Sequence, residues 1–359
     1  AERCLWLFQK LYKNNPSDFK VDSISNMFFM ALGLDQLPQA FVSTLASHFT
    51  ELSSQIFASS PLSERASPEP GYLRVYEKPL LVVVSSDFRQ HPVGRFWLPI
   101  ARHLRSQFRV ISVAGMPHEQ DLIRDELRQL SDEWWPMEAT EVVNTANRIR
   151  ELVPSMLLDL GGHTADNHPV LLSQRLATVQ ATYLGFYGPT YAACSDWWIV
   201  DHALMPWIEN SYPGAEALWP LPGPSLCYVP ELHRLPDPLS ITYQEPSHPV
   251  YGSFNHTRKL TRATRKRFGT VLAANPDALL KFRSHSFHDP AVRRYFLQRF
   301  CDAGIAPHQL QPLSFAPSPS EAMADYGRIH LHLDSSPVCG TTTTLDSLAM
   351  GIPVLTSPT

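Results

Sequence analysis

The sequence lacks the features that mark several large classes of protein. It has only five cysteines among 359 residues, widely spaced and with no C-x-x-C pair, which argues against a disulfide framework and against a zinc ribbon. No apolar run approaches the ~20 residues that a membrane span needs, and no signal-peptide pattern opens the printed sequence. We therefore expect a cytoplasmic protein with no membrane partner.

Excess charge and the common phosphate-binding motifs are also missing. The formal net charge is −4, from 30 Lys+Arg and 34 Asp+Glu, so bulk charge argues against nucleic acid as a partner. Neither G-x-G-x-x-G nor G-x-x-x-x-G-K-[ST] occurs, which disfavours a dinucleotide redox enzyme and a P-loop NTPase. There is no Asp-x-Asp triplet to hold a divalent ion over a diphosphate. We therefore expect no cofactor and no metal, with a diphosphate bound by lysine and a helix dipole instead.

The first 60 residues carry apolar side chains at helical spacing, for example in Phe28–Leu32 and Phe41–Leu52. This spacing predicts a short all-α N-terminal segment over residues 1–60. Two interpretations stay open, a helical cap on the next domain or the remnant of a helical repeat array. Residues 61–79 are rich in Ser, Pro and Glu and are typical of a linker.

From Leu80 onward the pattern changes to alternating strands and helices, which predicts an α/β fold with two Rossmann-like halves facing a cleft, residues 80–248 and 249–359. Between the two series, Leu204–Pro249 is rich in proline and is interpreted as an irregular crossing. The predicted strands of the first half are Leu80–Ser86, Phe108–Gly115, Met156–Gly162, Val179–Phe186 and Trp197–Asp201. Those of the second half are Val250–Phe254, Ala278–Arg283, Leu310–Phe315, Ile329–Asp334 and Pro353–Thr356.

Ligands of such folds lie at the carboxyl ends of strands, so we expect functional residues directly after each strand. In the first half, Asp87 and His91 follow the first strand, where a histidine at a helix entry can titrate near neutral pH. A plain helix cap explains these two residues equally well. His163 and Thr164 follow a glycine turn that lets backbone approach a ligand, although a simple strand-to-loop turn is an equal alternative.

Two constellations in the second half point to an anion. Lys259 stands among polar residues after a strand, together with His256, and could neutralise a diphosphate as a point charge. Gly340 and Thr341–Thr344 open a helix, with Asp346 placed in its first turn. Hydroxyl residues at a helix N-terminus add donors to free backbone N–H groups, and this combination predicts a phosphate site. Helix capping alone would explain only one of the four threonines.

The order of these motifs resembles the catalytic region of the O-GlcNAc transferase and SPINDLY family, glycosyltransferase family 41, in a bacterial-type version. The resemblance runs from about Leu80 to Thr359. It implies an inverting enzyme of the GT-B type that needs no metal, modifies Ser or Thr of intracellular proteins and stands behind a tetratricopeptide (TPR) array. The motifs that carry it are SSDFRQHP, LDLGGHT, VQATYLGFYGPT, LPGPSLCY, FNHTRK and LDSSPVCGTTTTLDSLAMGIPVLT.

The resemblance also implies roles for individual residues. His91 would be the active-site histidine that positions the acceptor or takes its proton, with His163 as a further catalytic residue. Asp87 and Thr164 would lie on the acceptor side, and Lys259 would stabilise the leaving diphosphate in a single in-line displacement. The donor-binding residues implied are Gln180, His256, Gly340, Thr341, Thr342, Thr343 and Asp346.

The sequence departs from the family at several positions. His256 stands where animal enzymes have glutamine, Thr341 where they have histidine, and Ala322 at another frequent histidine. The G-T-T-T-T run resembles the SPINDLY branch, whose plant members use GDP-fucose, so UDP-GlcNAc is favoured but a fucosyl donor stays open. Transfer of glucose to Asn and a non-catalytic scaffold are further alternatives. The family continues beyond the motif at Thr359, so we expect the second half to be incomplete.

Overall fold

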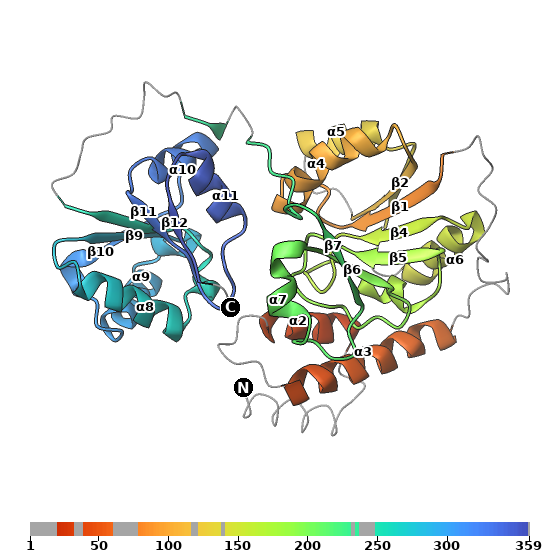
Figure 1. Ribbon diagram of the computed structural model, residues 1–359, viewed down its shortest axis with the longest axis horizontal. Helices are drawn as coiled ribbons and strands as arrows, with labels where there is room; N and C mark the ends of the chain where they lie inside the picture. The colour runs from red at the N-terminus through yellow and green to blue at the C-terminus, as the bar shows by residue number, and fades with distance from the viewer. Residues whose placement is uncertain are drawn as a thin grey trace. The chain divides into compact units, whose positions relative to one another are not determined.

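The computed structural model describes residues 20–31, 39–59, 78–115, 121–137, 141–230, 234–236 and 248–357. These residues divide into two compact units (Figure 1), of which the first ends at Val229 and the second continues from Pro230. The division falls earlier in the chain than the boundary after residue 248 that the sequence predicts. The predicted linker lies outside the described residues except for residues 78 and 79.

Unit 1 includes two N-terminal helices, α2 (Val21–Ala31) and α3 (Gln39–Ser59). Both confirm the helical spacing in the sequence. Their apolar faces are buried, with Phe28 on α2 and Phe49 on α3 almost fully inaccessible to solvent. The helices therefore pack as part of unit 1 (Figure 1) and share its core.

The rest of unit 1 is built on one sheet of seven parallel strands in the order β3-β2-β1-β4-β5-β6-β7. Five of these strands match the predicted ones. Two were missed, β3 and β7, and β7 lies inside the stretch that was wrongly interpreted as a wholly irregular crossing. Both are edge strands of four or five residues that are only partly buried, so neither carries the apolar run that reveals a central strand. The strands are β1 (Leu80–Ser85), β2 (Arg109–Ala114), β3 (Glu133–Pro136), β4 (Met156–Asp159), β5 (Val179–Thr182), β6 (Trp197–Asp201) and β7 (Ala217–Leu221).

Helices connect most of these strands. One pair, α4 and α5, lies together along β1 and β2 in Figure 1. The start of α4 is fixed by proline at its first position and by His91 as N-cap. The helical segments are α4 (Pro92–Leu104), α5 (Leu122–Leu130), α6 (Val142–Leu152), η3 (Pro169–Ser173), η4 (His202–Leu204) and α7 (Met205–Ile208).

Unit 2 contains a sheet of five parallel strands in the order β10-β9-β8-β11-β12. All five strands match the predicted ones, and an α-helix follows each of the first four. The strands are β8 (Val250–Ser253), β9 (Leu279–Arg283), β10 (Leu310–Leu313), β11 (Leu331–Leu333) and β12 (Val354–Leu355). The helical segments are η7 (Thr257–Lys259), α8 (Arg262–Ala273), η8 (His285–His288), α9 (Pro290–Cys301), η9 (Pro307–Gln309), α10 (Pro319–Tyr326) and α11 (Thr342–Ala349).

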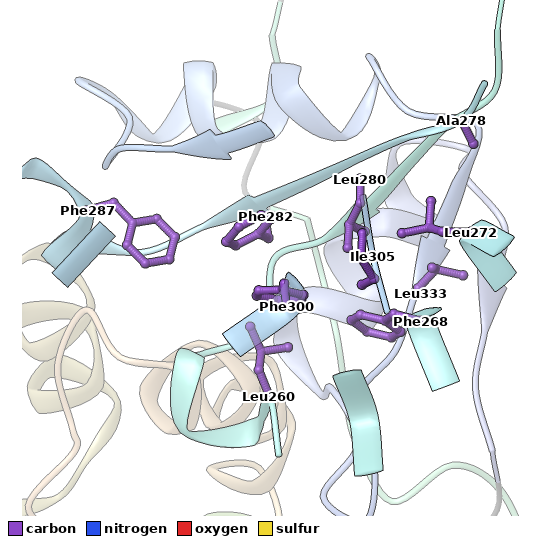
Figure 2. Packing of buried hydrophobic residues seen from close by; sticks show 10 residues of the cluster. All are labelled: Leu260, Phe268, Leu272, Ala278, Leu280, Phe282, Phe287, Phe300, Ile305 and Leu333. Carbon is purple, nitrogen blue, oxygen red and sulfur yellow. The ribbon is translucent and has the colours of Figure 1, made fainter. Parts of the chain in front are cut away.

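An aromatic core holds the sheet of unit 2 to its helices. Figure 2 shows Phe282 of β9 beside Phe300 of α9, and their ring centroids lie 4.5 Å apart. Phe287 meets Phe282 edge-on at 5.5 Å. Burial of each such side chain contributes roughly 1.5–3 kcal/mol. This core anchors the strands whose carboxyl ends carry the predicted motifs.

In each sheet, the order in which strands are added reverses at one pair of neighbouring strands. In unit 1 the order grows outward on either side of the β1–β4 pair, and in unit 2 on either side of the β8–β11 pair. Connections leave such a pair in opposite directions, which opens a crevice at the carboxyl ends of the two strands. Each of the four predicted groups of site residues comes after a different one of these strands.

Candidate active-site residues in the two units

The loop after β1 holds a buried carboxylate, Asp87, which is 4% exposed. Its Oδ1 accepts a hydrogen bond from the Arg89 guanidinium at 3.0 Å and lies 3.5 Å from Nδ1 of His91. Its Oδ2 accepts a bond of 3.3 Å from the side-chain amide of Asn167, in the loop after β4. The structure therefore brings Asp87 and His91 together, as the sequence predicts for the acceptor side.

His91 combines a capping role with partial exposure. Its Nδ1 accepts from the backbone N–H of Val93 at 3.4 Å, which is long for a hydrogen bond. Burial lowers the pKa of His91, and the charges of Arg89 and Arg95 add to this against the opposing effect of Asp87. The imidazole is thus neutral at pH 7. The two contacts of Nδ1 belong to different tautomers: the one that donates the Nδ1 proton to Asp87 gives up the bond from Val93 and leaves on Nε2 a lone pair that can take a proton.

Thr164 and Asn167 complete this network from the loop after β4. The Thr164 hydroxyl donates to the carbonyl of Gly161 at 2.7 Å and accepts from the Asn167 amide at 2.8 Å. Asn167 also accepts from the backbone N–H of Ser86 at 2.8 Å, so it joins the loops after β1 and β4. The sequence analysis missed Asn167, although it follows the glycine turn where polar residues are expected.

The glycine turn itself depends on Asp159 at the end of β4. The carboxylate accepts from the backbone N–H of Gly162 at 2.7 Å and of Gly161 at 3.3 Å. Burial raises the pKa of Asp159 to about 6 in spite of these two bonds. Gly162 has φ of +52°, which only glycine adopts at little cost. The turn is thus a built structural feature, whose first glycine lies against the side chain of Asn167.

His163 does not line a solvent-accessible site, contrary to the prediction. Its side chain is fully buried and stacks on Phe28 of α2 with centroids 4.3 Å apart. Nδ1 lies 3.0 Å from the hydroxyl of Ser25, and Nε2 lies 2.9 Å from the carbonyl of Thr190. Burial lowers the pKa of His163 to about 4. The residue is therefore a neutral core histidine that holds α2 against the rest of unit 1.

Gln180 also has a structural environment. It is fully buried in β5, where its Oε1 accepts from the backbone N–H groups of Leu176 and Ala177 at 2.6 and 3.1 Å. Its Nε2 donates to the carbonyls of Gln174 and Cys194 at 3.1 and 2.9 Å. All its polar atoms thus serve the loops around β5. The structure gives no support to the predicted contribution of Gln180 to donor binding.

In unit 2, Asn255 and Asp334 form the centre of the polar network. The Asn255 amide donates to Oδ1 of Asp334 at 2.9 Å, and its Oδ1 accepts from the Thr343 hydroxyl at 2.8 Å. The same Asp334 oxygen accepts from the backbone N–H of Gly340 at 2.6 Å. Both residues are buried. The structure thus brings Gly340 and Thr343 together, through an asparagine that was not predicted as a site residue.

Lys259 joins this group from the other side. Its Nζ donates to the carbonyl of Cys339 at 2.7 Å, directly before the glycine that leads into α11. Burial lowers the pKa of Lys259, while the charge of Asp334 acts in the opposite direction. His256 is exposed and caps η7, accepting from the backbone N–H of Arg258 at 3.2 Å. The ammonium of Lys259 therefore lies beside the predicted phosphate-binding turn.

The N-terminus of α11 is open to an anion. Thr341 is the N-cap residue but makes no side-chain cap bond. Among the described residues, no acceptor binds the backbone N–H groups of Thr342 and Thr343, and the buried hydroxyl of Thr344 has no partner there. Such a helix end carries a partial positive charge and unused donors. The prediction of an anion site at this run of threonines therefore fits the geometry.

Asp346 is placed differently from the prediction. Because α11 begins at Thr342, Asp346 lies in its second turn and not in its first. It is buried, with Oδ2 lying 3.4 Å from the Arg234 guanidinium. The pair connects α11 with the segment around residue 234. The structure thus supplies a charged protein partner for Asp346, and a contact with ribose stays a prediction.

Two other kinds of feature are absent from the described ranges. No group of three or more His, Cys, Asp and Glu side chains within them is arranged to hold a metal ion. None of the described helices is long and apolar enough to cross a membrane.

Two α/β units are typical of GT-B glycosyltransferases when each is built on a parallel sheet and has polar loops at the point where the strand order reverses. A mutant of the O-GlcNAc transferase of Thermobaculum terrenum has this fold with a TM-score of 0.79, 24% identity, and coverage of 99% of this chain and 65% of the other. The predicted α/β fold of the GT-B type, with helices before it, is thereby confirmed. A comparison with protein-family models finds no match.

The predicted family resemblance is also confirmed by curated relatives. The chain is 28% identical over 291 residues to a rice protein and 29% identical over 292 residues to a tomato protein. Both are named "Probable UDP-N-acetylglucosamine--peptide N-acetylglucosaminyltransferase SPINDLY". An Arabidopsis thaliana protein with the same enzyme name and the designation SEC is 24% identical over 291 residues. The chain spans about 31% of the length of the rice and tomato relatives, and these matches cover 79% of this chain.

Proposed function

We propose that this chain is the catalytic region of a protein O-glycosyltransferase that transfers a sugar, GlcNAc in the favoured case, from a nucleotide-sugar to Ser or Thr of intracellular proteins. The observation that carries the proposal is the position of Lys259 beside the open N-terminus of α11, at the switch point of unit 2. A cation and a helix dipole together stabilise a diphosphate without a metal. The names of the relatives, which give UDP-N-acetylglucosamine and a peptide, support this choice of sugar and acceptor.

The proposed reaction is a single in-line displacement that inverts the anomeric carbon. The acceptor hydroxyl oxygen forms the new bond to that carbon as the bond to the diphosphate oxygen breaks. The hydroxyl proton passes to Nε2 of His91, which the Asp87 contact orients at 3.5 Å. The negative charge of the departing nucleotide is stabilised by Lys259 and by the backbone N–H groups of Thr342 and Thr343.

Three alternatives make different predictions. A GDP-fucose enzyme would use the same diphosphate site, and the G-T-T-T-T run at Gly340–Thr344 favours it. Transfer of glucose to Asn would leave a different mass and a different linkage on the acceptor. A non-catalytic scaffold would bind nucleotide or peptide without turnover. We place the enzyme in the cytoplasm, without nucleic acid or membrane among its partners.

Thermal-shift binding of nucleotides and the mass of a modified acceptor protein distinguish the proposed function from its alternatives. A rise in melting temperature with UDP and not with GDP supports GlcNAc transfer, and the reverse supports fucosyl transfer, because a ligand of the native state stabilises it by mass action. Intact mass of a modified acceptor protein then identifies the sugar.

Two variants test the proposed site residues. His91→Ala and Lys259→Ala should each abolish turnover while retaining the fold. A near wild-type rate in either variant would remove that residue from the site. Absence of both nucleotide binding and transfer in a well-folded protein would reject the enzyme and leave the scaffold.

A further inference from the structure

Unit 1 contains a cavity of about 420 Å³ that the sequence analysis did not anticipate and the proposed reaction does not use. It lies where α2 and α3 meet the loop after β4, and this volume falls in the range of ligand sites. One wall is apolar, with Leu52 and Ile56 of α3 facing Val170 of η3. Lys20, Asp22 and Gln55 supply polar groups around it.

A histidine lines the cavity without a hydrogen-bond partner. His168 is 9% exposed, and no hydrogen bond of its ring to any described residue is found. Burial lowers the pKa of His168, against the charges of Asp22 and Asp166. A neutral imidazole offers one donor and one acceptor, the pair of groups that a peptide backbone requires. The cavity thus contains a mostly buried imidazole whose ring nitrogens have no hydrogen-bond partner among the described residues.

The charges around the cavity argue against a nucleotide. Among the described residues, the lining contains one cation, Lys20, and one carboxylate, Asp22, and Asp166 acts on the same histidine from outside the lining. A diphosphate would meet the Asp22 carboxylate here and gain no net positive charge, whereas α11 in unit 2 offers it open backbone donors. A ligand with apolar side chains and a neutral, hydrogen-bonding backbone fits this lining better.

The cavity is connected to the proposed acceptor network. Asn167 lines it and also donates to Asp87 at 3.3 Å, and Asp87 lies 3.5 Å from His91. Only two side-chain contacts therefore separate the cavity from the imidazole. The cavity therefore shares a lining residue, Asn167, with the network that contains His91.

We infer that this cavity is a subsite for the acceptor polypeptide. In it an apolar side chain beside the modified Ser or Thr packs on Leu52, Ile56 and Val170, and the peptide backbone hydrogen-bonds to His168. The inference rests on the proposed function for the identity of the polypeptide. It assigns to α2 and α3 a direct part in choosing the acceptor sequence.

A pair of tryptophan variants on α3 tests the subsite. Gln55 is exposed and lines the cavity, so Gln55→Trp should fill it, whereas Ser54→Trp adds the same side chain at a neighbouring exposed position outside the lining. The probe is a positional-scanning library of decapeptides with a central Ser or Thr and one flanking residue fixed, measured by fluorescence polarisation. The wild-type protein should prefer Val, Ile, Leu or Pro at one flanking position. Gln55→Trp should weaken that binding about tenfold, the effect of altering an apolar pocket, and Ser54→Trp should leave it unchanged.

A second measurement avoids any folding defect of the variants. Hydrogen exchange of the wild-type protein with the preferred peptide should show protection in residues 52–56 and 167–170. Equal binding by Gln55→Trp and Ser54→Trp, absence of a flanking preference, or absence of that protection would overturn the inference. Binding of UDP and GDP is measured in parallel. A peptide preference that Gln55→Trp removes, in a protein with neither nucleotide binding nor transfer, would reject the proposed function and keep the subsite.

Discussion

Asn255 and Asp334 are joined by a hydrogen bond of 2.9 Å that links the loop after β8 to the loop after β11. Each of the two residues also holds the start of α11, Asn255 through the Thr343 hydroxyl and Asp334 through the backbone N–H of Gly340. The position of the proposed phosphate site therefore depends on one buried amide and one buried carboxylate. Lys259 approaches the same turn through the carbonyl of Cys339.

Replacement of the Asn255 amide should break the link between the loop after β8, the loop after β11 and the start of α11. Asn255→Ala removes one hydrogen bond from the buried Asp334 carboxylate and leaves the half-buried Thr343 hydroxyl without its acceptor, a loss of about 1–3 kcal/mol in the free energy of unfolding. Nucleotide affinity should fall at least about tenfold, because the open end of α11 is no longer held against Lys259. Urea unfolding and calorimetric titration with UDP and GDP measure both effects.

The matched control is Asn275→Ala, whose side chain donates at 2.8 Å to the carbonyl of Val271 at the end of α8. It should lose stability without losing nucleotide affinity. Equal nucleotide binding by Asn255→Ala and the wild type would contradict the proposed role of the network.

Gly340 should not tolerate even one added carbon. A Cβ there would lie 2.6 Å from the hydroxyls of Thr343 and Thr344 and 2.8 Å from Oδ1 of Asn255. Gly340→Ala should therefore displace the start of α11 and weaken nucleotide binding about as much as Asn255→Ala. Gly223→Ala, where a Cβ meets nothing within 4 Å, is the control and should bind nucleotide normally. Thermal-shift titration suffices for the comparison, and an unaffected Gly340→Ala would refute the packing argument.

The fold could be predicted because central parallel strands are continuous apolar runs and each is followed by polar residues. That pattern located the loops after β1, β4, β8 and β11. It could not show which way a side chain points after the strand. His163 occupies a motif position like that of His91, but α2 and α3 cover it, and their packing depends on Phe28 and Phe49 far away in the sequence.

The connecting amides were missed for a related reason. Asn167 and Asn255 each lie in a predicted polar loop, but their importance comes from partners about 80 residues distant. A single sequence carries no signal for such pairing. Charged residues and histidines can be proposed as site residues from their chemistry alone. These two amides matter only because of where the fold places them.

The buried state of His163 makes stability depend on pH in a predictable direction. Its pKa is about 4 in the folded protein against 6.5 ordinarily. Between pH 4 and pH 6.5, His163 is therefore protonated in the unfolded chain and neutral in the folded chain. The resulting stability is fully present above pH 6.5 and is lost as the pH falls toward 4, a change of about 3 kcal/mol. His163→Gln removes this titration. Its destabilisation relative to the wild type should be largest at pH 7.5 and should shrink steadily toward pH 4.

Asp159 has the opposite effect and must be separated from His163. Its raised pKa, about 6 against 3.8 ordinarily, contributes stability at low pH that is lost as the pH rises through 6. Both proteins in the comparison retain Asp159, so its effect cancels in their difference. Urea unfolding at several pH values gives that difference directly. A destabilisation by His163→Gln that does not vary with pH would show that His163 is not a buried neutral group.

Two histidines, His332 on β11 and His330 directly before that strand, offer a contrast in hydrogen bonding. His332 is fully buried, and neither ring nitrogen has a hydrogen-bond partner among the described residues. Burial lowers its pKa to about 4. His330, two residues earlier, accepts at 2.9 Å from the backbone N–H of Val250. An unpaired buried polar group costs about 1–3 kcal/mol, so His332→Leu should stabilise unit 2, whereas His330→Leu should destabilise it by about 1 kcal/mol.

The gain for His332→Leu should be larger at pH 5 than at pH 7.5. Below pH 6.5 His332 is protonated in the unfolded wild type, but it stays neutral in the folded wild type until the pH approaches 4. The wild type therefore loses stability as the pH falls over this range. The leucine variant has no such titration, so it escapes that loss of stability. Leucine also fits the apolar surroundings of Phe254 and Tyr326, whose rings lie 6.1 and 6.0 Å from the imidazole. Urea unfolding of both variants at the two pH values decides the matter, and a His332→Leu protein less stable than the wild type at pH 5 would mean that the imidazole is satisfied in the folded chain.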